Sequence, residues 1–277
     1  MLLLLLLLFP SYWKAGKHDD LTTFDLFFRK SPFNGEFTIF AGLHEAISFL
    51  ETFPLNADEI GFLKATLPST VEPAFFDYMA SVDCRDVHVQ ALPEGSVAFP
   101  RIPLLRISGP LLVTQLIESP LLNLVNYASL VATNAARHRL VAGPSVQLFE
   151  FGLRRAQGPD GALSASRYSF LGGFDGTSNV ASARLFGIPL KGTHSHSFVS
   201  SYTGWQDIRD PRLRRGDIGA GAGESAQADD INVKDSALQA LQDVLAIEEI
   251  RSMSGSNPNE SELIAFCGYA QVRPGNG

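Results

Sequence analysis

The segment GTHSHSF, residues 192–198, carries two histidines that lie two positions apart among small and hydroxyl-bearing residues. In a strand, His194 and His196 would point to the same face, a geometry that suits two zinc ligands. A catalytic zinc site also needs a third protein ligand, and the other histidines stand alone in unrelated segments. Metal binding, a packed or solvated histidine and a catalytic histidine all stay open here, and no set of metal ligands is predicted.

The residues before this segment indicate its place in the fold. FGIPLKG, residues 186–192, predicts a strand that ends just before the histidine segment. Proteins of the α/β class place their sites at the carboxyl ends of parallel strands. We therefore expect the histidines at such an end.

Two arginines form the second candidate site. Arg154 and Arg155, in EFGLRRAQGPDG, follow a predicted strand. A planar guanidinium can make two charge-assisted hydrogen bonds to a phosphate, although arginines at strand ends are more often surface charges. Adjacent residues at a strand exit point to opposite faces, so we expect at most one of the two to enter a given pocket.

The segment LGGFDGTSN, residues 171–179, offers glycines and hydroxyls just before a predicted helix. Its backbone N–H groups could hold an anion, or the segment could form only a turn and a helix N-cap. It does not match the GxxxxGK[ST] pattern of a P-loop.

The N-terminal part of the chain predicts short antiparallel strands and helices. Phe24, Leu26 and Phe28 alternate with polar residues, as in a half-buried strand, and EFTIFAG predicts a second strand. Asn34-Gly35 between them is typical of a hairpin turn. Helices are expected in LHEAISFLETF, NADEIGFLKATLP and EPAFFDYMASV, with N-terminal features at Asn56 or Asp58 and at Glu72.

Prolines 93, 100 and 103 interrupt residues 86–108, which predicts an antiparallel sheet rich in edges. Residues 110–141 predict a helical stretch that is interrupted at Pro120 and ends at Gly143-Pro144.

From residue 145, the order of strand, loop, helix (178–186) and strand is typical of βα units with a parallel sheet. Residues 204–235 show little periodicity and predict a flexible loop, and helical patterns return in residues 236–277. An eight-stranded βα barrel needs roughly 250 residues, so only the first part of a barrel is expected after residue 145.

Composition excludes several classes of partner. The net charge of −7 argues against binding to the phosphate backbone of a nucleic acid. Two distant cysteines without CxxC spacing indicate a reducing compartment, and we expect a cytosolic protein. The initial run of seven leucines is shorter than the roughly 20 apolar residues that span a bilayer, so no membrane partner is expected.

Five segments, in order, resemble the signature blocks of nicotinate phosphoribosyltransferases. They are PEGSVAFPRIPLLRISGPL, NYASLVATNAAR, GLRRAQGPDG, YSFLGGFDGTSN and GTHSHSF. The resemblance runs from about Tyr12 to Thr203, with a weaker echo from Glu260 to Ala270. It implies an α/β fold: an antiparallel α+β N-terminal domain (12–110), then a helical segment with the first strands (111–203) of an incomplete, irregular type II phosphoribosyltransferase barrel.

The resemblance also implies an activity. Members of this family join nicotinate to 5-phosphoribosyl 1-diphosphate, with Mg²⁺ and with ATP hydrolysis, in the first step of NAD synthesis from nicotinate; they are homodimers. The phosphorylated histidine of the family motif GTxxHS is His196 here, and Thr193 matches a nicotinate contact. Arg154 matches a contact to the phosphate-bearing substrate, with Arg155 as a companion, and His194 is a neighbour. The resemblance therefore favours one modified imidazole over two metal ligands.

The chain also departs from the family pattern. Residues 1–11 stand where the family has a DLYQ-type segment, so they are expected to be a leader foreign to the family, and the LDSGD-like motif of later strands does not occur. We expect a truncated, catalytically impaired chain. An alternative is a fragment that binds and modulates a full-length subunit, and a secreted or membrane-tethered binding module ranks last.

Overall fold

The computed structural model describes residues 3–53, 55–213, 231–245 and 259–272. They form two compact units, residues 1–192 and residues 193–277, and each is described by itself. Most of the predicted flexible loop (204–235) and part of the predicted C-terminal helical segment (236–277) lie outside the described residues.

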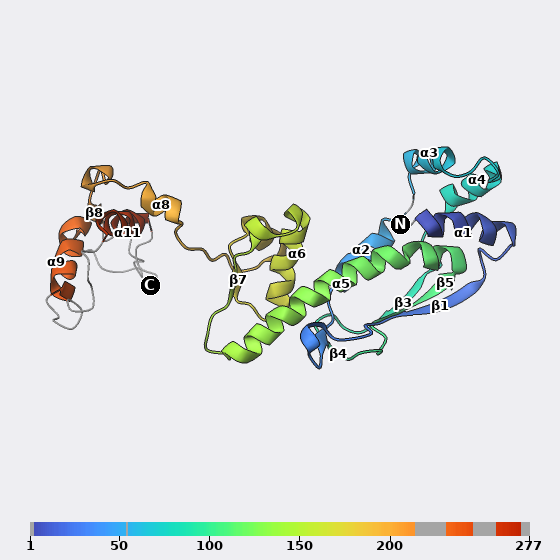
Figure 1. The fold of residues 1–277 in the computed structure, drawn as a ribbon, viewed down its shortest axis with the longest axis horizontal. Coiled ribbons are helices and arrows are strands. Elements are labelled where there is room, and N and C mark those ends of the chain that lie inside the picture. The colour runs from blue at the N-terminus through green and yellow to red at the C-terminus, as the bar shows by residue number, and fades with distance from the viewer. Residues whose placement is uncertain (1–2, 54, 214–230, 246–258, 273–277) are drawn as a thin grey trace, which may run out of the picture. The chain divides into compact units, whose positions relative to one another are not determined.

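The first unit contains a three-stranded antiparallel sheet (Figure 1). Its strands lie in the order β1 (Leu21–Leu26), β5 (Leu105–Pro110) and β3 (His88–Ala91), and Leu26 pairs with Leu105. The predicted antiparallel sheet within residues 86–108 is thereby confirmed.

The predicted hairpin between the first two strands is wrong. The chain does turn there, with positive φ angles of 59° at Phe33 and 51° at Asn34, in the 3-10 turn Pro32–Asn34. However, β2 (Thr38–Ile39) pairs with β4 (Val97–Ala98), while β1 pairs with β5. The Asn34-Gly35 pair determines the backbone conformation of the turn. Which strands pair with each other depends instead on the burial of the strand faces, and here the partners are distant in sequence.

Four short helices belong to the same part of the first unit. They are α1 (Leu3–Lys14), α2 (Leu43–Glu51), α3 (Ala57–Thr66) and α4 (Pro73–Ser81). Asn56 caps α3 as predicted, because its Oδ1 accepts from the Glu59 N–H at 2.9 Å while Glu59 Oε2 accepts from the Asn56 N–H at 2.8 Å. Glu72 occupies the N-cap position of α4 but makes no capping hydrogen bond.

The first helix contributes to the core of the first unit. Phe9 of α1, in the segment expected to be a leader, is fully buried against Phe75 and Met79 of α4. No helix in the described part of the chain combines the length and the apolar character needed to cross a membrane.

The long helix α5 (Leu111–Ala142) runs past the sheet at one end and past α6 at the other (Figure 1). The predicted interruption at Pro120 is wrong, because the helix continues through the proline. Pro120 removes one backbone hydrogen bond, but Ile117 and Leu121 on either side are almost fully buried. The helix ends at Gly143, as predicted, with φ at 75°.

A parallel unit follows, as the sequence predicted. The strands β6 (Phe149–Glu150) and β7 (Gly176–Thr177) are parallel, and Leu190 forms a further parallel bridge to Thr177. Helix α6 (Gly158–Leu171), which connects β6 to β7, was not predicted from the sequence, whereas helix α7 (Val180–Phe186) was.

The second unit is mainly helical. Helix α8 (His196–Ser200) packs against α11 (Glu260–Val272), and α11 also contacts α9 (Val233–Leu245). The short strands β8 (Arg212–Leu213) and β9 (Ile231–Asn232) form an antiparallel pair. The predicted C-terminal helices are thus confirmed over their described residues.

We predict that Gly172→Ala lowers the free energy of unfolding by about 2 kcal/mol, because α6 and α5 approach too closely there for a methyl group. An added Cβ would lie 2.6 Å from Ala135 Cβ and closer still to the Ala132 carbonyl oxygen. Urea denaturation measures the change. The matched control is Gly161→Ala, where the nearest atom would be 3.5 Å away. It should stabilise α6 slightly, and equal destabilisation by both variants would contradict the account.

Candidate functional site

The two predicted arginines lie at the carboxyl end of β6. Both belong to a 3-10 turn, η2 (Leu153–Arg155), and both are exposed. The prediction that the two arginines point to opposite faces of a strand is therefore wrong, because successive side chains of a 3-10 turn are about 120° apart. Neither guanidinium has an ion-pair partner among the described residues, so both are available to an anionic ligand.

The Glu150 carboxylate gathers donors from three elements at this end of the sheet. Its Oε2 accepts from Ser166 Oγ of α6 at 2.7 Å and from Thr177 Oγ1 of β7 at 2.8 Å. Its Oε1 accepts from the backbone N–H of Gly152. Ser166 and Thr177 are each 1% exposed, so this carboxylate satisfies hydroxyls that water does not reach.

The last three residues of the segment LGGFDGTSN, residues 177–179, form a turn and a helix cap. This was one of the two alternatives that the sequence left open. The side-chain oxygen Oδ1 of Asn179 accepts from the Ser182 N–H at 3.3 Å. The backbone N–H of Asn179 donates to Thr177 Oγ1 at 3.0 Å. The Ser178 N–H donates to the Glu150 carbonyl at 3.1 Å. These N–H groups are thus engaged within the protein, so an anion cradle at this segment is not supported.

An arginine from α5 holds the loops beside β6 and β7. Arg139 donates to the carbonyls of Gly173 at 2.8 Å and Val146 at 2.6 Å, and it forms an ion pair with Asp175. Asp175 also accepts from the Leu148 N–H at 2.7 Å. This backbone hydrogen bond and the Arg139 guanidinium hold the pKa of Asp175 below its ordinary value.

The sequence analysis missed Glu150, Ser166, Arg139 and Asp175. Two of them carried a usable signal: Glu150 and Asp175 are acids at the edges of apolar strand segments, next to the predicted arginines and glycines. An acid in such a place usually needs a partner.

The predicted histidine segment lies in the second unit. His196 is the first residue of α8, whose N-cap is Ser195, and both side chains are exposed. His194 is also exposed, and its ring meets the Phe266 ring edge-on at 4.6 Å. The same-face argument for two zinc ligands is wrong, because these residues do not form a strand. A core position is likewise excluded for His196.

Thr193 is exposed at the start of the second unit, and its hydroxyl donates to the His194 carbonyl at 3.2 Å. The structure thus brings Thr193 and His196 together in one unit and Arg154 and Arg155 together in the other. Across the described ranges, no three His, Cys, Asp or Glu side chains converge as metal ligands.

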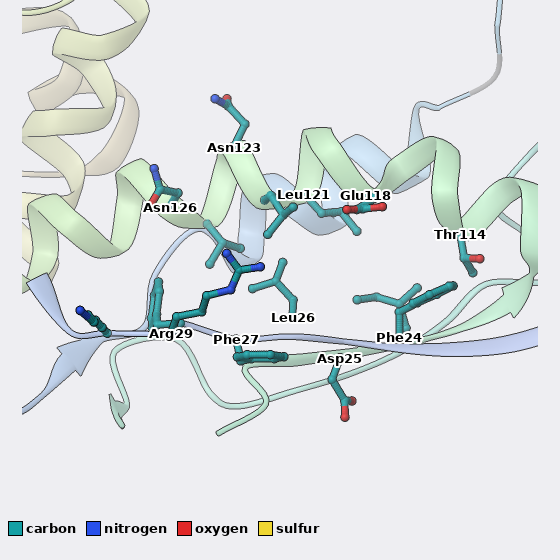
Figure 2. Close-up of a pocket in the computed structure, with 15 residues that line it drawn as sticks. Phe24, Asp25, Leu26, Phe27, Arg29, Thr114, Glu118, Leu121, Asn123 and Asn126 are labelled. Atoms are coloured by element: carbon teal, nitrogen blue, oxygen red, sulfur yellow. The ribbon is translucent and has the colours of Figure 1, made fainter. Parts of the chain in front are cut away.

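A cavity of about 760 Å³ lies between β1 and α5 in the first unit (Figure 2). Its apolar lining includes Leu26 of β1 and Leu121 of α5, and Arg29, just after β1, extends toward α5. None of the predicted site residues lines it. A smaller hollow of about 410 Å³ adjoins α8 in the second unit, and its lining includes Tyr202, Asp207 and Arg209.

We predict that Asp175→Asn reduces the dependence of stability on acid pH. A carboxyl whose pKa is lowered by folding contributes stability above its unfolded pKa, and this contribution is lost as pH falls through the folded value. The wild-type free energy of unfolding should therefore fall below about pH 4, and part of that fall should vanish in the variant. Urea denaturation from pH 7 to pH 3 measures this. Asp160→Asn, an exposed acid in α6, is the control, and an unchanged pH profile in Asp175→Asn would contradict the account.

Comparisons with known proteins give a consistent result. The family model described as nicotinate phosphoribosyltransferase N-terminal domain matches residues 6–126. Nicotinate phosphoribosyltransferase 1 of Arabidopsis thaliana is 55% identical over 95% of this chain and 45% of its own length. The Homo sapiens nicotinate phosphoribosyltransferase is 48% identical over 95% of this chain and 47% of its own length.

The solved structures agree with these relatives. The crystal structure of human nicotinic acid phosphoribosyltransferase matches with a TM-score of 0.83 and 47% identity, over 99% of this chain and 53% of that one. A nicotinate-nucleotide pyrophosphorylase from Pyrococcus furiosus shares the fold, with a TM-score of 0.57 and 20% identity over 98% of this chain and 62% of that one. The predicted fold class is confirmed. The chain is similar to nicotinate phosphoribosyltransferases over nearly its whole length and spans about half the length of the curated relatives it matches.

Proposed function

We propose that this protein acts in the transfer of a phosphoribosyl group to nicotinate, the first step of NAD synthesis from nicotinate. The observation that carries the proposal is the match to the human enzyme over 99% of the chain, at a TM-score of 0.83. Because the chain spans about half the length of that enzyme, the substrates and the activity are proposals for it.

Arg154 is the proposed contact for the phosphates of 5-phosphoribosyl 1-diphosphate, and Arg155 is its companion. Both are exposed at the carboxyl end of a parallel strand and have no ion-pair partner in the described part of the chain. Breaking the bond from ribose to diphosphate leaves negative charge on the departing group. A fixed guanidinium stabilises that charge as it develops.

His196 is the proposed phosphoryl acceptor. In this step the γ-phosphoryl group of ATP passes to an imidazole nitrogen, a P–O bond breaks as a P–N bond forms, and ADP leaves. The exposed ring and the small neighbours Ser195 and Ser197 leave room for the group. The added charge of roughly −1.5 to −2 could then alter the affinity for the other substrates. Thr193, three residues earlier, is the proposed nicotinate contact.

Mg²⁺ is proposed as a companion of the substrate phosphates. The described residues offer no cluster of three carboxylate, imidazole or thiolate ligands, and the Glu150 oxygens already accept from three donors. Mg²⁺ is commonly held by substrate phosphates and few protein ligands. This donor set does not form a magnesium site of its own.

Homodimer formation and a cytosolic location are further proposals that rest on the family resemblance. The alternative function, a chain that binds and modulates a longer subunit, also stays a proposal. Mixing this chain with a full-length relative and measuring turnover distinguishes the two functions.

We predict that the purified chain binds 5-phosphoribosyl 1-diphosphate and that Arg154→Ala weakens this binding about 10- to 100-fold, since charge-assisted hydrogen bonds are lost. Arg155→Ala should have a smaller effect. The control is Arg184→Ala, which removes an exposed cation of α7. Isothermal titration calorimetry measures the affinities. Absence of binding by the wild-type chain would contradict the proposed function, and equal losses in Arg154→Ala and Arg184→Ala would contradict the assigned contact.

We also predict that γ-labelled ATP transfers its label to the wild-type chain and to His194→Ala but not to His196→Ala. Mass spectrometry of the acid-labile phosphopeptide locates the modified residue. Label on His194, or retained label in His196→Ala, would overturn the assignment of the phosphoryl acceptor.

A further inference from the structure

We propose that Glu150 is a positioning residue that acts through the turn carrying Arg154. Its carboxylate fixes the backbone just before that turn and thereby sets where the Arg154 guanidinium meets a phosphate. The inference rests on the proposed function, because it assigns the way in which that site is built.

The geometry around Glu150 supports this role. One oxygen accepts from the N–H of Gly152, the residue that immediately precedes η2. The other accepts from Ser166 and Thr177 on the neighbouring helix and strand, at 2.7 and 2.8 Å. The carboxylate therefore ties the start of the arginine turn to two buried side chains.

Few hydrogen bonds hold this turn. Its backbone hydrogen bonds run from the Arg155 N–H to the Gly152 carbonyl at 2.9 Å and from the Ala156 N–H to the Leu153 carbonyl at 3.3 Å. Within the described chain, the contact from Glu150 is the one side-chain hydrogen bond to the backbone of residues 151–157. Loss of this contact leaves an exposed turn whose arginine must be ordered when the ligand binds, which reduces affinity.

A carboxylate binds this set of groups better than a neutral amide does. The Gly152 N–H is an obligate donor, whereas the Ser166 and Thr177 hydroxyls can also accept and have further acceptors in the carbonyls of Ala162 and Glu150. A Gln side chain can keep its oxygen on Gly152, but it replaces three charge-assisted hydrogen bonds with weaker neutral ones. Glu150→Gln therefore weakens the restraint while it keeps the volume.

The test is a double-mutant cycle on the complete 277-residue chain, with 5-phosphoribosyl 1-diphosphate as the ligand in isothermal titration calorimetry. Glu150→Gln should weaken binding about tenfold, and the same substitution should cause no further loss in Arg154→Ala, because both remove one function. An unchanged affinity in Glu150→Gln, or an equal loss in both backgrounds, would overturn the inference.

Glu45→Gln is the matched control. The Glu45 carboxylate accepts from Arg167 and Tyr168 of α6, so the variant disturbs a comparable network in the same unit without touching the arginine turn. It should lower thermal stability at least as much as Glu150→Gln does and leave ligand affinity unchanged. Equal loss of affinity in both variants would show that Glu150 acts only through stability, and would overturn the inference.

Hydrogen exchange separates this inference from the proposed function. The Arg155 amide should exchange faster in Glu150→Gln than in the wild-type chain, with no ligand present, because its acceptor Gly152 is held less firmly. If the wild-type chain does not bind the ligand, the proposed function fails, and this exchange rate still decides whether Glu150 fixes the turn. Unchanged exchange would overturn the inference.

Discussion

The first unit depends on the continuity of α5. At 32 residues this helix is about 48 Å long, and it packs on the antiparallel sheet through its first half and on α6 through its second half. Near α6, the small residues Ala132 and Ala135 leave room for the close approach of the Gly172 backbone. Arg139, in the last turn of α5, forms an ion pair with Asp175, which immediately precedes β7. A kink at Pro120 would move the parallel strands away from the sheet, so burial on both sides of the proline keeps the two parts in place.

The polar groups around the parallel strands β6 and β7 divide into two sets. Glu150 and Asp175 accept hydrogen bonds from neighbouring backbone and side chains, and their charges are compensated within the unit. Arg154 and Arg155 follow Glu150 at the carboxyl end of β6, whereas Asp175 precedes β7 at its amino end, and neither arginine has an ion-pair partner among the described residues. Anions satisfy such guanidinium groups, and a ligand with several phosphates can engage both. The structural acids hold the loops so that the arginines stay available.

Local patterns in the sequence predicted most elements, but not how they pair or continue. Asn34-Gly35 marked a real turn, yet β1 pairs with β5, because strand partners depend on burial of distant side chains. Pro120 predicted a break that tertiary packing overrides. Helix α6 was not predicted because its glycines and serines give only a weak helical pattern. Residue chemistry and spacing indicated the arginine and histidine candidates, and the family motifs assigned their roles, whereas the Glu150 contacts needed the three-dimensional structure.

Our central proposal is that the phosphates of 5-phosphoribosyl 1-diphosphate bind at the exposed arginine turn after β6. A crystal structure of the chain with bound 5-phosphoribosyl 1-diphosphate tests it most directly. The account predicts phosphate oxygens within hydrogen-bond distance of the Arg154 guanidinium. Phosphate density elsewhere, for example beside Arg29 in the cavity between β1 and α5 (Figure 2), with none at Arg154, would contradict it.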